Sequence, residues 1–170
     1  MPETGPVMAY AEFLDPEMLM EGIRDSHLIP CQLSARPAAS WIGRWSASRI
    51  GLDLVSLGPA MIFSGAMPKE RYTLTFVLAC PGGGVSYNFG IRHTDGYLGL
   101  YPPGSVLETS MAEGCVSANL TVPVEEFHAA AARHFPEIPE RVLRHGAGMK
   151  VGPAEQAVLR GRLQPSVYLS

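Results

Sequence analysis

The sequence predicts a mainly β domain, a jelly roll or β-barrel, with a short N-terminal helix and two or three C-terminal helices. Three observations support this fold class. Short apolar runs separated by Gly, Ser and Pro fill the chain from about residue 27 to 122. A corner at Pro102-Pro103-Gly104 ends one of these runs, because proline lacks an N–H donor and glycine accepts a positive φ. After Pro123, apolar residues recur at helical spacing.

Bulk properties narrow the class of protein. The 170 residues suit one domain, and 46% hydrophobic with 17% charged residues is typical of a folded globular chain. The net charge of −3 argues against a surface that binds nucleic acid. There is neither an apolar run of about 20 residues nor a basic, apolar secretory signal at the N-terminus. We therefore expect a single cytoplasmic domain that has no membrane partner.

The 3 cysteines, Cys31, Cys80 and Cys115, are odd in number and too far apart for a CxxC pair. We expect them to be small buried residues that remain reduced in the cytoplasm. A catalytic thiol is disfavoured, because no positively charged or histidine-rich segment adjoins any of them.

The first predicted helix begins at Asp15-Pro16-Glu17, where a capping carboxylate precedes a proline and an acid, and extends to about Arg24. From His27 to Leu57, short apolar runs with turn residues between them predict antiparallel strands. Two tryptophans and two arginines alternate here, Trp41, Arg44, Trp45 and Arg49. They could form a base-stacking surface, but we favour core packing because two arginines are too few to follow a phosphate backbone.

The clearest strand is Tyr72 to Cys80, where apolar and semi-polar residues alternate. One face carries Leu74, Phe76 and Leu78, and the other carries Thr73, Thr75 and Val77. Pro81-Gly82-Gly83-Gly84 follows and predicts a turn, because a phosphate-binding glycine loop would open a helix and would carry a Lys-Ser/Thr pair.

The stretch from Tyr87 to Glu108 predicts strand, hairpin, strand, corner and strand. Asp95-Gly96 supplies the tight hairpin turn, and Pro102-Pro103-Gly104 supplies the corner. Further strands are expected at 60–63 and 115–122.

Helices are expected after Pro123. The first has two acids in its first turn, an apolar stripe through Phe127 and Ala131, and an end at Phe135-Pro136. A second includes 140–143, and a third begins at Gly152-Pro153. The helical part thus extends from about 123 to 164. Its basic residues are expected to complement helix C-termini; the alternative is an interface with an acidic partner.

The central stretch resembles the second cupin motif, G-x5-P-x-G-x2-H, through Gly96, Pro102 and Gly104. The position of the metal-binding histidine in that motif is Leu107 in this chain, and upstream His93 stands alone. An apolar side chain cannot bind a metal, and one imidazole is too few for a catalytic centre. We therefore expect a cupin-like barrel without metal or other cofactor.

A broader resemblance extends from Trp41 to Phe135. It includes GRWSASRIGLDLVSLGPAMIFSGAMPKERYTLTFVLA, the Tyr-Asn at 87–88, LGLYPPGSVLE and SANLTVPVEEF, in that order. This order is similar to the N-terminal domain of AraC-type transcription regulators. The resemblance implies a domain that senses a small-molecule effector, dimerises, or does both. It also implies that DNA is bound by a separate domain with two helix-turn-helix units, for which the helices after Pro123 are too few.

We therefore predict a regulatory, non-enzymatic domain that pairs with a second copy through its C-terminal helices. A barrel interior can enclose one small ligand. Aromatic and imidazole side chains offer both apolar contact and a hydrogen-bonding tip. The candidate ligand-binding residues are Trp45, Phe76, Tyr87, His93 and Tyr101.

The alternative is a metal-dependent cupin-type enzyme, an isomerase or a dioxygenase, with His93 and Asp95 or Glu108 as acid and base. The sequence argues against it in two ways. A histidine just before a hairpin turn is expected to be solvated, and no second histidine is placed to complete a ligand set. The remaining histidines, in other elements, are His27, His128, His134 and His145.

Overall fold

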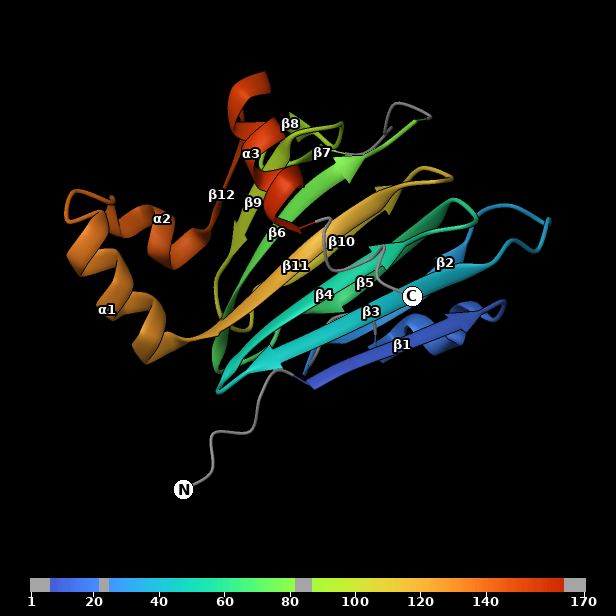
Figure 1. Ribbon diagram of the computed structural model, residues 1–170, viewed down its shortest axis with the longest axis horizontal. Coiled ribbons are helices and arrows are strands. Elements are labelled where there is room, and N and C mark those ends of the chain that lie inside the picture. Colours follow the sequence, from blue (N-terminus) through green and yellow to red (C-terminus); the bar gives the residue numbers. More distant parts are fainter. Residues whose placement is uncertain (1–6, 22–24, 82–86, 164–170) are drawn as a thin grey trace.

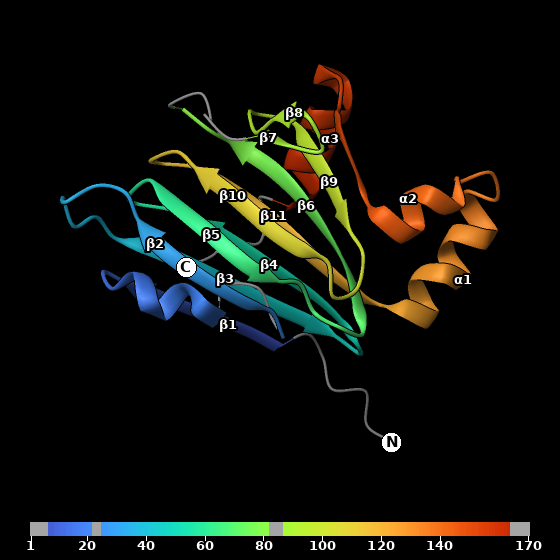
Figure 2. The ribbon, with the colours of Figure 1, turned by 180° about the vertical axis from the view of Figure 1, so that it is seen from behind.

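Two antiparallel sheets form the body of the protein in the computed structural model, which describes residues 7–21, 25–81 and 87–163 (Figure 1). The large sheet has the strand order β1-β3-β4-β11-β6-β9-β12, and the small sheet has the order β10-β5-β2. The small sheet lies behind the large one in Figure 1 and in front of it in Figure 2, so the two sheets form separate layers. The prediction of a mainly β fold is confirmed.

The large sheet contains β1 (Val7–Phe13), β3 (Ser40–Ala47), β4 (Ile50–Ser56), β11 (Val116–Pro123), β6 (Arg71–Ala79), β9 (Tyr97–Tyr101) and β12 (Ala147–Lys150). The small sheet contains β2 (His27–Gln32), β5 (Met61–Ala66) and β10 (Val106–Met111). A separate two-stranded hairpin contains β7 (Tyr87–Asn88) and β8 (Ile91–Arg92). The helices are η1 (Pro16–Glu21), α1 (Val124–His134), α2 (Glu140–His145) and α3 (Pro153–Leu163).

The main core lies between the two sheets. It contains Val77 of β6 and Tyr97 of β9 from the large sheet, and Met61 of β5 and Met111 of β10 from the small one. Leu19 of η1 joins the same cluster and is buried. Burial of these apolar side chains is the main force that holds the two layers together.

The corner at Pro102-Pro103-Gly104 moves the chain from one sheet to the other. β9 ends in the large sheet at Tyr101, and β10 begins in the small sheet at Val106. The Ser105 N–H donates to the carbonyl oxygen of Pro102 at 3.2 Å, and Gly104 has a φ of 67°. The predicted corner is therefore confirmed.

The turn at Asp95-Gly96 is present, but it does not make the expected hairpin. The Tyr97 N–H donates to the Thr94 carbonyl oxygen at 3.0 Å, and Gly96 has a φ of 78°. However, β8 before this turn pairs with β7, whereas β9 after it pairs with β6 and β12. The actual hairpin turn is Phe89-Gly90, where both residues have positive φ. The dipeptide showed where the chain reverses but not which strands would pair.

The N-terminal segment differs from the expectation in two ways. β1 precedes the predicted β region and forms an edge of the large sheet by pairing with β3. The predicted first helix is a 3-10 helix that ends at Glu21, and residues 22–24 lie outside the described part. The Glu17 N–H donates to the Asp15 carboxylate at 2.9 Å, so the predicted capping contact does form.

The three predicted C-terminal helices are present, and a strand that was not predicted separates the last two. β12 extends the large sheet by pairing with β9, with Gly148 opposite Gly99. With only four residues, one of them Gly148, and with Gly146 directly before it, β12 has little sequence signal of its own. The C-terminal part is therefore joined to the β part through the sheet, and the boundary near residue 123 does not separate two units.

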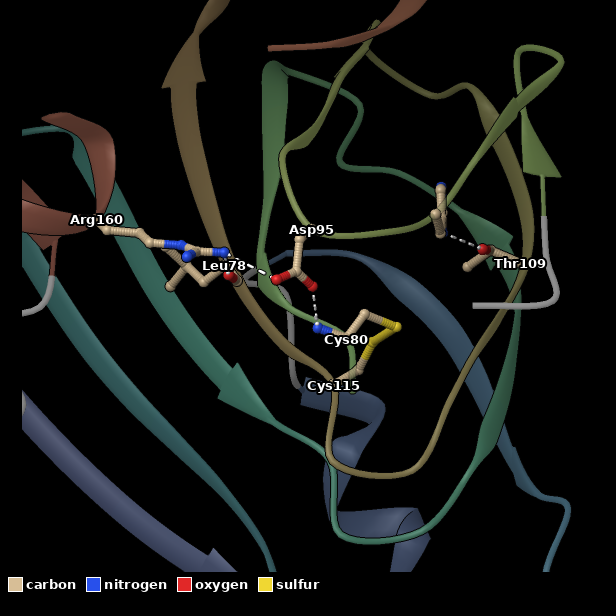
Figure 3. Close-up of a disulfide and its surroundings, with 7 residues drawn as sticks. Leu78, Cys80, Asp95, Thr109, Cys115 and Arg160 are labelled. Atoms are coloured by element: carbon tan, nitrogen blue, oxygen red, sulfur yellow. Dashed lines mark hydrogen bonds and ion pairs between the residues drawn. A yellow bond between two sulfur atoms is a disulfide. The ribbon is translucent and has the colours of Figure 1, made fainter. Parts of the chain in front are cut away.

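The cysteines also differ from the expectation, because Cys80 and Cys115 form a disulfide (Figure 3). Cys80 follows β6, Cys115 precedes β11, and these strands are neighbours, which brings the two Cα atoms to 4.3 Å. Both residues are buried as expected, but Cys31 is exposed. The separation of 35 residues hid this pairing, since adjacency across a sheet is not visible in sequence. The cysteines were expected to remain reduced, so with this disulfide they no longer support a location in a reducing compartment.

Asp95 links this end of the sheet to α3 (Figure 3). Its carboxylate accepts a hydrogen bond from the Cys80 N–H at 2.7 Å and one from Arg160 Nη2 at 3.0 Å. Arg160 also donates to the carbonyl oxygen of Leu78. A charge-assisted contact of this kind fixes the position of α3 on the outer face of the large sheet.

Candidate functional site

A cavity of about 60 Å³ lies between the two sheets. Its walls come from β4, β6, β9 and β11 of the large sheet, from β2, β5 and β10 of the small sheet, and from η1 and the segment after β8. The apolar lining residues are Leu19, Leu28, Val55, Leu57, Phe63, Leu107 and Met111. The polar ones are Thr75, His93, Tyr101, Thr109 and Asn119.

A row of polar residues crosses the large sheet at this cavity. In register, Arg44 of β3 lies opposite Asp53 of β4, Asp53 lies opposite Asn119 of β11, and Asn119 lies opposite Thr75 of β6. The Thr75 hydroxyl donates to Asn119 Oδ1 at 2.8 Å. Arg44 Nε lies 3.6 Å from the Oδ1 of Asp53, whose side chain has no exposed surface. One wall of the cavity is thus polar where a sandwich interior is usually apolar.

The expectation that His93 is solvated is wrong, because the residue is buried and only 2% of it is exposed. Its Nδ1 lies 3.1 Å from the Thr109 hydroxyl, and its ring centroid is 4.2 Å from that of Tyr97. Burial lowers the pKa of His93 to about 4, since the charged imidazolium would lose its hydration. The ring is therefore neutral at pH 7.

The hydroxyl of Tyr101 lies at the end of a short hydrogen-bonded chain. Asn88 Nδ2 donates to it at 2.7 Å, and the hydroxyl of Tyr97 lies 3.3 Å away. Burial raises the pKa of both tyrosines, so the phenols stay protonated. The described polar residues of the cavity lining thus offer hydroxyl, amide and neutral imidazole groups, and none of them carries a formal charge at pH 7.

The structure separates the five candidate ligand-binding residues. His93 and Tyr101 both line the cavity. Trp45 and Phe76 lie on the opposite face of the large sheet, in a cluster that α3 covers. Side chains alternate along a strand, and the preceding residues, Arg44 and Thr75, face inward. The backbone of Tyr87 pairs with Arg92 in the β7-β8 hairpin, but its side chain lies outside the described part.

Three polar lining residues were not candidates on the sequence: Thr75, Thr109 and Asn119. The alternation in β6 does carry a signal for Thr75, because it places Thr73, Thr75 and Val77 on one face. The alternation in β11 likewise places Ser117, Asn119 and Thr121 on one face. Thr109 has no comparable signal, since β10 carries polar residues on both of its faces.

Leu107, at the position of the cupin histidine, is buried and lines the cavity beside Thr109. Within residues 7–21, 25–81 and 87–163, no group of three or more His, Cys, Asp or Glu is placed to hold a metal ion. The side chains that reach the cavity therefore do not fit a cupin metal centre.

A second hollow, of about 410 Å³, lies on the outer face of the large sheet between β6, β9, β12 and the helices α1 and α2. We call it the outer groove. It is lined by Leu74, Leu98, Leu100, Phe127, Ala130, Ala131, Phe135, Ile138, Val142, Ala147, Gly148 and Met149. Phe135 and Met149 remain 68% and 54% exposed, so this groove opens apolar surface to solvent.

Compared with protein-family models, with curated proteins and with solved structures, the chain has no match in any of the three comparisons. Among the described residues, no helix is both long enough and apolar enough to cross a membrane. The functional assignment therefore depends on the geometry of the cavity and on the sequence resemblance.

Proposed function

We propose that this chain is the effector-binding domain of an AraC-type transcription regulator, and that the cavity between the two sheets binds the effector. The observation that carries the proposal is a cavity between the two sheets that is lined mainly by apolar side chains and by a few polar ones, among them His93, Tyr101 and Thr109. Ligand sites have this composition: apolar surface supplies affinity, and a few placed polar groups supply specificity. The ordered resemblance from Trp41 to Phe135 supports the family assignment.

The proposed role is non-catalytic, and DNA binding is assigned to a separate domain, as in the regulators that the chain resembles. That role belongs to the cytoplasm, where a structural disulfide such as Cys80–Cys115 is rare, so the disulfide argues against this part of the proposal. The metal-dependent cupin enzyme is not proposed, because Leu107 occupies the histidine position and Asp95 is held by Cys80 and Arg160 away from the cavity.

The outer groove supports the second part of the role, pairing with another copy through the C-terminal helices. Its exposed Phe135 and Met149 are continuous with the apolar stripe of α1 and with the edge strand β12. Apolar surface of this kind on a folded domain is typical of a protein interface.

A thermal-shift screen with a small-molecule library tests the effector role. A ligand at a hundred times its Kd adds about 2.7 kcal/mol, which raises the Tm by about 5–10 °C for a chain of this size. We expect Val55→Phe, which places a ring in the cavity, to abolish the shift. The matched control Val158→Phe changes an exposed valine of α3 and should leave the shift intact. A library that stabilises neither the parent nor the control would contradict the proposal.

A further inference from the structure

A chain of contacts connects the Cys80–Cys115 disulfide to α3 (Figure 3). The Cys80 N–H donates to Oδ1 of Asp95 at 2.7 Å, and Oδ2 of the same carboxylate accepts from Arg160 Nη2 at 3.0 Å. Arg160 belongs to α3, so one carboxylate joins the backbone beside the disulfide to the helix. A shift of the Cys80 backbone therefore moves the carboxylate that holds Arg160.

α3 is attached to the large sheet through one side of the helix. None of its 11 residues is fully buried. The half-buried residues recur at helical spacing and are Gln156, Leu159, Arg160 and Leu163. Leu159 and Leu163 pack against the apolar cluster on the outer face of the sheet. A helix with so little buried surface opens locally at a low free energy, so the contact between Arg160 and Asp95 is a large part of its attachment.

Reduction of the disulfide changes the space that its two sulfur atoms need. Two thiol sulfur atoms cannot approach as closely as two bonded ones, so the residues that carry them must move apart. Cys115 is 0% exposed and Cys80 is 6% exposed, so this movement occurs in a close-packed interior. Cys115 is held by two backbone hydrogen bonds, to Leu57 and Ala112, whereas the N–H of Cys80 bonds to a side chain. We therefore expect Cys80 to move, and the contact with Asp95 to change.

We propose that the Cys80–Cys115 pair is a redox switch for the attachment of α3, in which the disulfide holds the helix on the sheet and the two thiols release it. The reductant is a small thiol such as glutathione. Its thiolate attacks the sulfur of Cys80, the S–S bond breaks, and the sulfur of Cys115 leaves as a thiolate that takes up a proton. A second glutathione releases Cys80 as a thiol and forms oxidised glutathione, which reverses both steps when it is in excess.

This inference goes beyond the proposed effector role and does not depend on it. Disulfides in the cytoplasm are rare, and those that occur there are usually transient and catalytic or redox-sensing. A pair that opens and closes therefore removes the conflict between this disulfide and the proposed cytoplasmic location. Leu98 belongs both to the cluster that α3 covers and to the outer groove, so release of α3 enlarges the apolar surface of that groove.

The experiment uses the full chain with Cys31→Ala, so that Cys80 and Cys115 are the only cysteines left. The chain is equilibrated in glutathione buffers with different ratios of the reduced to the oxidised form, and alkylation followed by mass spectrometry counts the free thiols. Amide hydrogen exchange over seconds to minutes then measures local opening of α3. β3, which is separated from β11 by β4, is the internal control.

We expect both thiols to appear reversibly as the proportion of reduced glutathione rises. In the reduced chain, the amides of α3 should exchange about five-fold faster, as the loss of one partly exposed, charge-assisted contact predicts. The amides of β3 should remain protected in both states, because labelling of this length detects local opening and not global unfolding.

Two variants of α3 distinguish the switch from a general loss of stability. Arg160→Gln removes the charged donor to Asp95, so α3 should exchange at the fast rate whether the pair is oxidised or reduced. Because coupling is reciprocal, this variant should also make the disulfide about five-fold easier to reduce in the glutathione equilibrium. Arg162→Gln changes an exposed arginine of the same helix and should keep both exchange rates and the equilibrium of the parent chain.

A disulfide that stays closed in a large excess of reduced glutathione would overturn the proposal, because it would be a permanent cross-link. Equal exchange of α3 in the oxidised and reduced chains would overturn it as well. So would a loss of protection in β3 together with α3, since the pair would then stabilise the whole fold. An Arg160→Gln chain that keeps the difference between the two states, or an Arg162→Gln chain that loses it, would show that the contact with Asp95 does not carry the coupling.

Discussion

The two faces of the large sheet differ in chemistry although they are built from the same strands. On β6, Thr73, Thr75 and Val77 face the small sheet, whereas Leu74, Phe76 and Leu78 face the helices. The inner face thus carries the polar groups, and the outer face carries the larger apolar side chains. In a protein interior the more apolar face usually points to the main core.

This inversion has a physical explanation in the two hollows. Polar groups on the inner face are kept because they are bonded in register across β3, β4, β11 and β6. The buried ion pair in this row stabilises little by itself, but the row brings the hydrogen-bonding groups of Thr75 and Asn119 to the cavity. The outer face packs its apolar side chains against α1 and α3.

The strongest test of the inner face is Arg44→Met. It removes the guanidinium next to the fully buried carboxylate of Asp53, and we expect a loss of about 3–5 kcal/mol in the free energy of unfolding. The double variant Arg44→Met/Asp53→Leu should recover most of this loss, because it removes both charges. Urea denaturation measures the free energy of unfolding of the single and the double variant. A double variant as unstable as the single one would show that the row does more than balance charge.

The second-largest loss of stability is expected for the disulfide, which joins β6 to β11 at one end of the inner face. Removing it with Cys80→Ala/Cys115→Ala should lower stability by about 2–4 kcal/mol, since the unfolded chain regains the freedom of the closed loop. The exposed Cys31 serves as the control, and Cys31→Ala should change stability by less than about 0.5 kcal/mol. Denaturation with and without a reducing agent provides the same comparison in the parent chain.

His93 gives the inner face a pH dependence. The folded chain keeps this ring neutral down to a pKa of about 4, whereas the unfolded ring takes up a proton near its ordinary value of 6.5. The unfolded state therefore binds more protons between these values, and stability is lost as the pH falls from about 6.5 to 4. At pH 5 the loss is about 2 kcal/mol relative to pH 7.5. His93→Gln should remove this part of the pH dependence of the free energy of unfolding. If the variant and the parent chain lose the same stability between pH 7.5 and pH 5, the ring of His93 is solvated in the folded state.

The smallest effect on folding is expected on the outer face. Phe135→Ser replaces a ring that is 68% exposed, so the free energy of unfolding of the monomer should change by less than about 0.5 kcal/mol. If the outer groove is the pairing surface, the same change should shift the chain from dimer to monomer in analytical ultracentrifugation. Val106→Ser changes an even more exposed apolar residue away from the groove and is the matched control.

Local residue chemistry was enough to predict many elements. The alternation at Tyr72–Cys80 predicts β6 almost to the residue, and Pro123 with its following acids predicts the start of α1. Pro102-Pro103-Gly104 predicts the corner between the sheets. These signals succeed because φ restriction, missing donors and side-chain alternation act within a few residues. β12 lacks such a signal and was missed.

The candidate site was only partly predictable. Of the candidate residues, His93 and Tyr101 line the cavity, whereas Trp45 and Phe76 lie on the other face of the large sheet. The alternation in β6 defines two faces without saying which one meets the small sheet. The burial of His93 was also missed, because the chain before Asp95-Gly96 passes over the interior instead of forming a solvent-exposed hairpin.

By itself, therefore, the sequence determined the mainly β class of fold, most of its strands and helices, and the corner that joins the two sheets. Only the tertiary structure decided which strands are neighbours, and with them the Cys80–Cys115 pair, the polar row and the cavity that His93 shares with Tyr101. The reason is physical: turns and alternation depend on neighbours along the chain, whereas pairing across a sheet depends on residues brought together from distant positions.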